Sequence, residues 1–318
     1  MKKNITLLIN KSEITAGTRG ASLGPEAVIT AARKQNNLFF GKFPIDHVSD
    51  ENHMLDAEVK YPHAKRIEGL VKVFDSVSSK VKGVIDDGGF PLVIAGDHGS
   101  AGGTIAGVKA AYPTKRLGVV WIDAHGDLHT PYTTPSGNMH GMPLATALSE
   151  DNTEVQSNTP ASDVVELWGT LKSMKVADPK VQAEDLAFIA VRDTEPQEDA
   201  LIERLKIKNH TVDEVREKGV EAVMAEIFDQ LKECDIIYVS FDVDSMDPEF
   251  TSYGTGTPVE HGLKPEEAEY FLVELAKHEK TVCMEFVEVN PCLDEKKNKM
   301  AEVTFDLLEK TTNELLNS

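Results

Sequence analysis

The sequence contains few cysteines, and their spacing limits what they can do. Cys234, Cys283 and Cys292 are the only three among 318 residues, and no two of them form a CxxC pair. This pattern argues against a disulfide framework and against a zinc site built from thiolates. We therefore expect all three cysteines to be reduced.

Positive charge is also scarce. Lys and Arg number 33 against 53 Asp and Glu, which gives a formal net charge of −20. Nucleic-acid binding requires a basic face, so this balance argues against it. The acidic excess favours solubility, and a second interpretation is that an acidic surface attracts cationic substrates.

Long hydrophobic runs are absent from the sequence. No apolar stretch approaches the roughly 20 residues of a membrane span. The N-terminal "MKKNITLLINK" has a basic tip, but its apolar stretch is too short for a signal peptide and no small-residue cleavage site follows. We expect a cytoplasmic protein that does not associate with membranes.

Short β-rich apolar runs alternate with longer amphipathic ones along the chain. Because 41% of the residues are hydrophobic, 318 residues can bury a large core. The runs predict strands buried on both faces, typical of a parallel sheet, at Ile5–Ile9, Pro91–Gly96, Leu117–Asp123, Leu186–Val191, Ile236–Asp242 and Thr281–Phe286. Helical periodicity is found at Pro25–Lys34, His63–Asp86, Thr211–Lys232, Lys264–His278 and Asp294–Leu316. We expect residues 1–318 to form one α/β domain, a three-layer α/β/α fold with a central, mostly parallel sheet. Glu150–Pro160, rich in Ser, Thr and Asn, is expected to be a surface loop.

Carboxylates and imidazoles follow four of the predicted strands. In parallel sheets the ligand site lies beyond the carboxyl ends of the strands. Residues two apart in an extended segment point to the same side, so each group can face one point. The residues in question are Asp97 and His98, then Asp123, His125 and Asp127, then Asp242 and Asp244, and finally Glu288.

Each of these groups alone has an ordinary explanation. The pair Asp242 and Asp244 could be a turn or cap, and His98 could be a loop histidine. The run "GDHGSAGGT" could cradle a phosphate, but it lacks the GK[ST] of a P-loop and the GxGxxG of a dinucleotide site. The ordinary explanations would have to place four polar clusters at four strand ends by coincidence, so we favour a metal site.

The donor set favours manganese. Its oxygen ligands outnumber its nitrogen ligands and no thiolate takes part, which suits manganese better than structural zinc. Six protein ligands are too many for one catalytic ion that keeps an open position, so we expect two ions that share carboxylates, roughly 3.5 Å apart, and activate a bridging water for hydrolysis. The predicted ligands are His98, Asp123, His125, Asp127, Asp242 and Asp244.

Four motifs in this order carry a family resemblance. "AGDHGSAGGT", "WIDAHGDLHTP", "SFDVDSMDPEF" and "VEVNP" resemble the ureohydrolase family, which contains arginases, agmatinases and formiminoglutamases, and "TTPSGNMHGMPLA" is similar to the arginase branch. The resemblance spans nearly the whole chain. It implies an arginase-like fold and a binuclear manganese enzyme that hydrolyses the guanidinium of L-arginine to L-ornithine and urea by attack of a metal-bridging hydroxide.

The resemblance also implies roles for single residues. Asp123 and Asp242 would bridge the two ions; His98 and Asp127 would complete one site, and His125 and Asp244 the other. Asp127 would in addition accept a hydrogen bond from the hydroxide. Glu288 would pair with the substrate guanidinium, and His140 would transfer protons at the mouth of the site. Both roles suit the side chains, because a carboxylate can hold a guanidinium bidentately and histidine exchanges protons near neutral pH.

Substrate choice depends on two further segments. The resemblance implies that the α-carboxylate of the amino acid is bound by Thr134, Ser136 and Asn138. It also implies that the α-amino group lies near Asp193, Glu195 and Glu198. Two residues depart from the family pattern: Glu195 stands where an aspartate is usual, and His129 replaces an asparagine of the carboxylate-binding loop.

Two alternative functions remain open. The protein could be another guanidino or formimino hydrolase, acting on agmatine, guanidinobutyrate or formiminoglutamate. It could also be a non-catalytic binding protein with the same fold, although such a protein has no need of the full ligand set, His140 and Glu288. The resemblance implies a homo-oligomer, a trimer or hexamer. No arginine follows Arg216, so arginine contacts from the C-terminal part are excluded.

Overall fold

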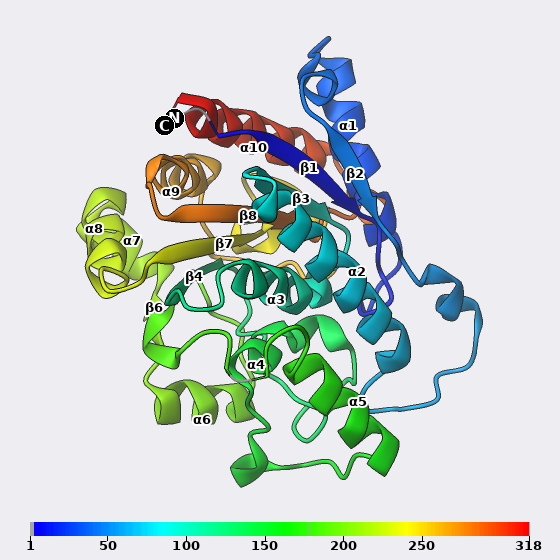
Figure 1. Ribbon diagram of the computed structural model, residues 1–318. Coiled ribbons are helices and arrows are strands. Elements are labelled where there is room, and N and C mark those ends of the chain that lie inside the picture. The colour runs from blue at the N-terminus through cyan, green and yellow to red at the C-terminus, as the bar shows by residue number, and fades with distance from the viewer. Residues whose placement is uncertain (1–2, 178, 318) are drawn as a thin grey trace.

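One parallel sheet forms the centre of the molecule (Figure 1). The computed structural model describes residues 3–177 and 179–317. Within these residues eight strands pair in the order β2-β1-β3-β8-β7-β4-β5-β6, and every pair is parallel. The strands are β1 (Ile5–Asn10), β2 (Ile45–Val48), β3 (Phe90–Ala95), β4 (Leu117–Ile122), β5 (Leu186–Ile189), β6 (Lys208–His210), β7 (Ile236–Asp242) and β8 (Thr281–Val287).

The six predicted strands are confirmed, with bounds that shift by at most two residues. Every residue of β3, β4 and β7 is buried, as the continuous apolar runs predicted. Strands β2 and β6 were not predicted. They are short and form the edges of the sheet; three of the four residues of β2 are exposed, and β6 has one exposed, one half-buried and one buried residue, so neither has a hydrophobic run.

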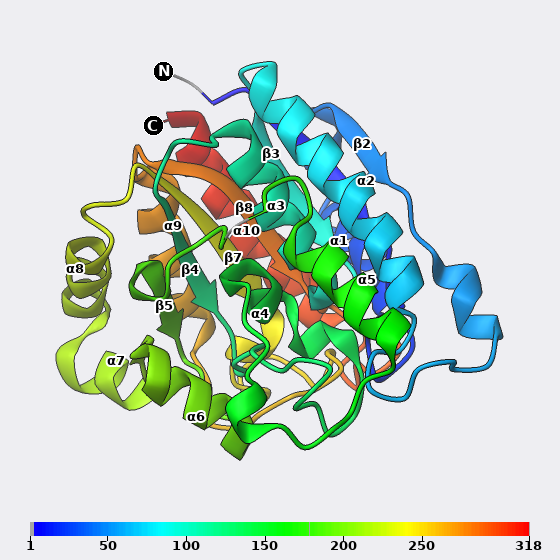
Figure 2. The same cartoon turned by 60° about the horizontal axis from the view of Figure 1, so that its bottom comes forward.

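Helices cover both faces of the sheet, which confirms the three-layer α/β/α fold (Figures 1 and 2). One face packs against α1 (Gly24–Lys34), α7 (Val212–Lys218), α8 (Val220–Gln230), α9 (Pro265–Lys277) and α10 (Lys299–Asn317). The other packs against α2 (Ile67–Asp86), α3 (Ala101–Ala111), α4 (Pro143–Leu148) and α6 (Pro196–Leu205), and α5 (Ser162–Lys172) lies outside α2 and α4.

The prediction of one helix over Thr211–Lys232 is wrong. Gly219, at φ +87°, separates α7 from α8, because this left-handed conformation cannot continue a helix. Two predicted helices begin later than expected, α2 at Ile67 and α10 at Lys299.

Four helices were missed, and α3 shows why. Its sequence "AGGTIAGVKAA" is rich in glycine and has little amphipathic pattern because most of the helix is buried. A Cβ on Gly103 would lie 2.6 Å from Val77 Cγ1, and one on Gly107 would lie 2.7 Å from the carbonyl oxygen of Ser78. The glycines therefore allow α3 to pack closely on α2. Because glycine has a low helix propensity, the same residues count against a helix when only the sequence is considered.

The predicted loop at Glu150–Pro160 is confirmed; its only regular element is a short 3-10 turn at Thr153–Val155. Among the described helices none has the length and apolar character needed to cross a bilayer. All three cysteines are free; Cys234 and Cys283 are buried and Cys292 is exposed.

The polar groups predicted to form a site follow β3, β4, β7 and β8, four neighbouring strands whose carboxyl ends lie along one edge of the sheet.

Candidate active site

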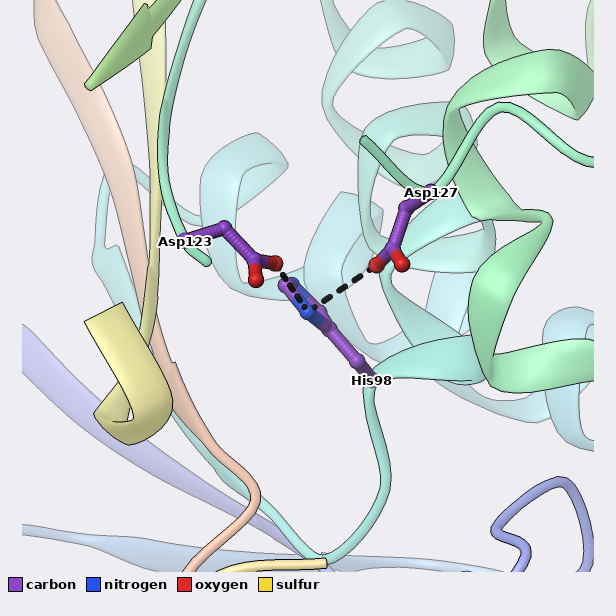
Figure 3. A group of neighbouring side chains, drawn as sticks. All are labelled: His98, Asp123 and Asp127. Carbon is purple, nitrogen blue, oxygen red and sulfur yellow. Dashed lines mark ion pairs between the residues drawn. The ribbon is translucent and has the colours of Figure 1, made fainter. Parts of the chain in front are cut away.

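His98 lies among three carboxylates, two of which, Asp123 and Asp127, are drawn in Figure 3. It begins a short 3-10 turn directly after β3, and its side chain is 2% exposed. The Nδ1 atom of His98 lies 3.1 Å from Asp123 Oδ2, 3.2 Å from Asp127 Oδ2 and 3.1 Å from Asp242 Oδ2. Residues from three separate strand ends therefore converge on one nitrogen, as the sequence predicted.

Three of the four atoms at this point have no hydrogen-bond partner among the described residues. They are His98 Nδ1, Asp123 Oδ2 and Asp127 Oδ2, all buried. Buried polar atoms are normally paired, and an unpaired one costs about 1–3 kcal/mol. Lone pairs that converge at contact distance without hydrogen bonding are the arrangement that a cation requires, so the donor set fits a metal ion.

A second group of ligands shares Asp123 with the first. His125 Nδ1 lies 3.1 Å from Asp244 Oδ2 and 3.5 Å from Asp123 Oδ1. Suitable ligand atoms of His125, Asp123 and Asp244 lie within 4.8 Å of one another, as do those of His98, Asp123 and Asp127. One carboxylate thus faces both groups, which is the geometry expected of a two-ion site.

The carboxylates carry strong mutual repulsion. Burial, together with the nearby Asp123 charge, raises the pKa of Asp127 well above the usual value for an aspartate. Burial also raises the pKa of Asp242, with Asp244 and Asp123 adding to the effect. Burial likewise opposes the ionisation of Asp123, but the adjacent imidazoles of His125 and His98 hold its pKa below the usual value. Divalent cations would relieve this repulsion.

Asp127 and Glu288 have a left-handed backbone, with φ of +50° and +68°. Such a conformation costs of order 1–3 kcal/mol in a non-glycine residue and concentrates at functional sites. Glu288 is 3% exposed, and its Oε1 accepts a hydrogen bond of 2.8 Å from the backbone N–H of His98. The Nδ1 of His140 lies 3.6 Å from the same oxygen. Glu288 and His140 are therefore brought together beside the metal-ligand cluster.

A pocket of about 260 Å³ opens over this cluster. Its walls include His98, His125, Asp127, Asp242 and Asp244 at the metal end. Thr134, Ser136, Asn138 and His140 line it as well, together with His129, Asp193, Glu195 and Glu198. Of the predicted site residues, Asp123 and Glu288 do not line the pocket.

The two residues that depart from the family pattern contact each other. His129 Nε2 lies 2.8 Å from Glu195 Oε2, and His129 Nδ1 lies 3.2 Å from Thr133 Oγ1. The hydrogen bond with His129 lowers the pKa of Glu195 to about 2. Burial raises the pKa of Glu198 to about 7, although Glu198 also accepts a hydrogen bond from the Leu128 N–H. His129, Glu195 and Glu198 are close enough to hold a cation, but a direct ion pair already satisfies two of them.

Two residues of the site, Ser240 and Thr257, were not predicted. Ser240 Oγ lies 2.8 Å from His98 Nε2, and Thr257 donates a hydrogen bond to Asp244 Oδ2 at 3.1 Å. Asp97, which was predicted to follow β3 but not to be a ligand, is fully buried, and burial and the nearby Glu288 raise its pKa to about 7. A signal existed for Ser240, which lies two residues before Asp242 on the same face of β7. No local pattern indicated Thr257.

Comparison with known proteins agrees with this geometry. The chain matches the arginase family over residues 5–312. It is 34% identical to the arginase of Brevibacillus brevis over 320 residues, with 97% of each chain covered. It is also 34% identical to the arginase of Bacillus caldovelox, with 96% of this chain and 97% of that one covered.

Solved structures give the same result. The native structure of the Bacillus caldovelox arginase has a TM-score of 0.81 at 33% identity, with 98% of each chain covered. The Entamoeba histolytica arginase in complex with L-ornithine has a TM-score of 0.81 at 25% identity, with 98% of this chain and 99% of that one covered. Formimidoylglutamase from Bacillus subtilis shares the fold, with a TM-score of 0.75 at 18% identity. Together with the paired ligand groups, these likenesses mean that the chain belongs to the arginase family, a family of metal-dependent amidinohydrolases.

Proposed function

We propose that this protein hydrolyses L-arginine to L-ornithine and urea with two manganese ions. One observation carries the proposal: two groups of ligands share Asp123 at the end of a pocket that Ser136 and Asn138 also line. The arginase relatives support arginine as the substrate.

Manganese is proposed from the donor set. Carboxylates with some imidazole suit Mn²⁺, and the absence of thiolates argues against a structural zinc site. His98, Asp123, Asp127 and Asp242 would hold one ion, and His125, Asp123, Asp242 and Asp244 the other, with Asp123 and Asp242 as bridges. When bound, the ions supply Lewis acidity and lower the pKa of a water molecule at the site.

The residues around the ions would orient the substrate and move protons. Glu288 would accept hydrogen bonds from the guanidinium and fix its carbon near the ions, because a carboxylate matches this planar fork of donors. When the C–N bond to the ornithine side chain breaks, the departing nitrogen needs a proton, and His140 is close enough to Glu288 to deliver it there. Asp127, beside the proposed ions, would also accept a hydrogen bond from the attacking water.

The α-carbon end of the substrate would bind at the rim of the pocket. Thr134, Ser136 and Asn138 would bind the α-carboxylate. Asp193, Glu195 and Glu198 would face the α-amino group. His129, engaged by Glu195 and Thr133, would hold Glu195 in place rather than contact the carboxylate.

A substrate panel tests the proposal. Urea release is measured from L-arginine, agmatine and guanidinobutyrate, and glutamate release from formiminoglutamate, with the manganese-loaded protein. We expect kcat/KM to be highest for L-arginine. A higher kcat/KM for one of the other compounds would assign the protein to another ureohydrolase activity, and metal uptake without any hydrolysis would indicate a binding protein.

Three broader expectations accompany this function. We propose that the chain forms one domain, which the single sheet with strands from both ends of the chain supports. We also propose a cytoplasmic homo-oligomer, a trimer or hexamer. Sedimentation of the metal-loaded protein would test the oligomeric state.

A further inference from the structure

Lys65 contacts the pocket rim from a segment that had no predicted role. Its Nζ donates a hydrogen bond of 3.0 Å to Asn138 Oδ1, and its backbone N–H donates one of 2.9 Å to the Gly137 carbonyl. The residue is half-buried. Both its main chain and its side chain are therefore attached to the 134–138 loop.

The contact between the two segments leaves no free space. Gly137 has φ +74°, and a Cβ there would lie 1.7 Å from the carbonyl oxygen of Pro62. Only glycine permits this approach without strain. The backbone on both sides of the Lys65–Asn138 contact is thus fixed before a substrate arrives.

Lys65 determines which way the Asn138 amide points. An ammonium group has only donors, so Asn138 must present its carbonyl oxygen to Lys65. The amide nitrogen then lies on the side of Gly17, where a Cβ would be 2.7 Å from Nδ2. The acceptor of Asn138 is occupied, and the group that remains to meet a ligand is a donor.

Apart from the proposed ions at the metal end, the pocket offers little positive charge to an anion. Six carboxylates line the pocket, and no lysine or arginine lines it among the residues that the structure describes. The ring nitrogens of His129 already contact Thr133 and Glu195. The proposed ions would lie at the metal end, so a substrate carboxylate at the rim would be stabilised by a further positive charge beside its binding position.

We propose that Lys65 is a specificity-determining residue that, with Asn138, forms the subsite for the carboxylate of an amino-acid substrate. The inference rests on the proposed function, because that function places the α-carboxylate at this rim. One N–H of the Lys65 ammonium holds Asn138 Oδ1, and no other side-chain hydrogen bond or ion pair engages this ammonium among the described residues. Its charge would therefore lie next to the carboxylate that Asn138 binds. Agmatine, which lacks the carboxylate, gains nothing from this subsite.

The test compares Lys65→Met, Lys65→Gln and Lys65→Arg with the unmodified protein. Dissociation constants for L-arginine and agmatine are measured by calorimetry on manganese-loaded protein at a pH where turnover is slow, and kcat and KM are measured separately. A charge-assisted hydrogen bond accounts for roughly a 10- to 100-fold change in affinity. We expect Lys65→Met to weaken arginine binding by about this factor, mainly through KM, and to leave agmatine binding within about twofold. Lys65→Arg should retain most of the arginine affinity. Lys65→Gln should show the same selective loss of arginine affinity as Lys65→Met, and it replaces Lys65→Met in the test if the methionine variant does not fold.

Lys72→Met is the matched control, since Lys72 lies on α2 and pairs with Glu51 at 3.0 Å, so the variant removes the same charge away from the pocket. Equal losses for arginine and agmatine in Lys65→Met would mean that Lys65 only supports the loop and would overturn the inference. Unchanged dissociation constants for both ligands would also overturn it. Absence of urea release from arginine, with the binding ratio still dependent on Lys65, would instead refute the proposed function and leave the subsite standing.

Discussion

The Oγ atom of Ser240 lies 2.8 Å from the Nε2 atom of His98. When Ser240 Oγ accepts a hydrogen bond from the Nε2–H group, the lone pair of Nδ1 is directed at Asp123, Asp127 and Asp242. The ring is also stacked on Trp121, with centroids 4.1 Å apart and an interplanar angle of 4°. A metal-ligating histidine needs this kind of support on its second nitrogen, which fixes its tautomer and orientation.

Ser240→Ala should therefore weaken metal binding. Loss of a partner of this kind typically costs about 10- to 100-fold in metal affinity. The measurement is the manganese dissociation constant by competition with a chelator. Ser78→Ala removes a buried hydroxyl on α2 and should leave the constant unchanged. Equal manganese affinity in Ser240→Ala and the unmodified protein would contradict the role of this hydrogen bond.

His140→Asn should separate catalysis from metal binding. His140 contacts Glu288 and is not among the proposed metal ligands, so the variant should retain its manganese. Because a general acid or base contributes about 10²- to 10⁴-fold, kcat should fall within this range. Turnover and metal content are measured on the same sample, with His53→Asn, an exposed histidine, as the control. Loss of manganese from a folded His140→Asn protein would show that the role is misassigned.

Gly137→Ala should impair arginine binding through the backbone. The added Cβ would meet the Pro62 carbonyl at 1.7 Å while the residue is held at φ +74°. We expect KM for arginine to rise at least about tenfold, because even 1.4 kcal/mol of strain in the bound loop corresponds to that factor. Gly88→Ala is the matched control, since Gly88 has φ +76° with nothing within 4 Å of the added Cβ. If both variants bind arginine equally well, the close contact with Pro62 does not shape the subsite.

His210 should make the protein sensitive to acid. The residue is fully buried on β6, where burial and the nearby Lys208 lower its pKa from 6.5 to about 4, against the opposing influence of Glu226 and Glu214. Between these two values the unfolded chain binds the proton more readily than the folded one, so stability is fully present above about pH 6.5 and is lost as pH falls toward 4. The loss attributable to His210 is of order 3 kcal/mol.

Urea unfolding of metal-free protein at pH 7 and pH 5 measures this effect. His210→Gln should show a smaller drop in unfolding free energy between the two pH values than the unmodified protein. His278→Gln is a suitable comparison because the pKa of His278 is also lowered by burial, but to a smaller extent. An identical drop in His210→Gln would exclude His210 as the source.

The sequence predicted the parts of the fold and site that have local signals. The central strands were found because burial on both faces requires continuous apolar runs, and the ligands were found because Asp123, His125 and Asp127 alternate directly after one of them. The edge strands β2 and β6 carry no such run. Helix α3 was missed because its glycines serve its packing on α2, which a local pattern does not record.

Contacts between distant segments could not be predicted. Lys65 and Asn138 are 73 residues apart, and nothing in either segment indicates that they meet. The pairing of His129 with Glu195 is similar, since the sequence showed two departures from the family pattern but not that they contact each other. Both contacts depend on how loops from different strands pack at one edge of the sheet.

The dependence of arginine hydrolysis on manganese content tests the central proposal most directly. The protein is stripped with a chelator, manganese is added in steps, and urea release from L-arginine is measured together with bound metal. We predict no urea from the stripped protein and a rate that rises with bound manganese until two ions are held per chain, with magnesium and zinc restoring less activity. Full urea production by the metal-free protein, or a maximal rate with a single ion bound per chain, would contradict the two-ion account.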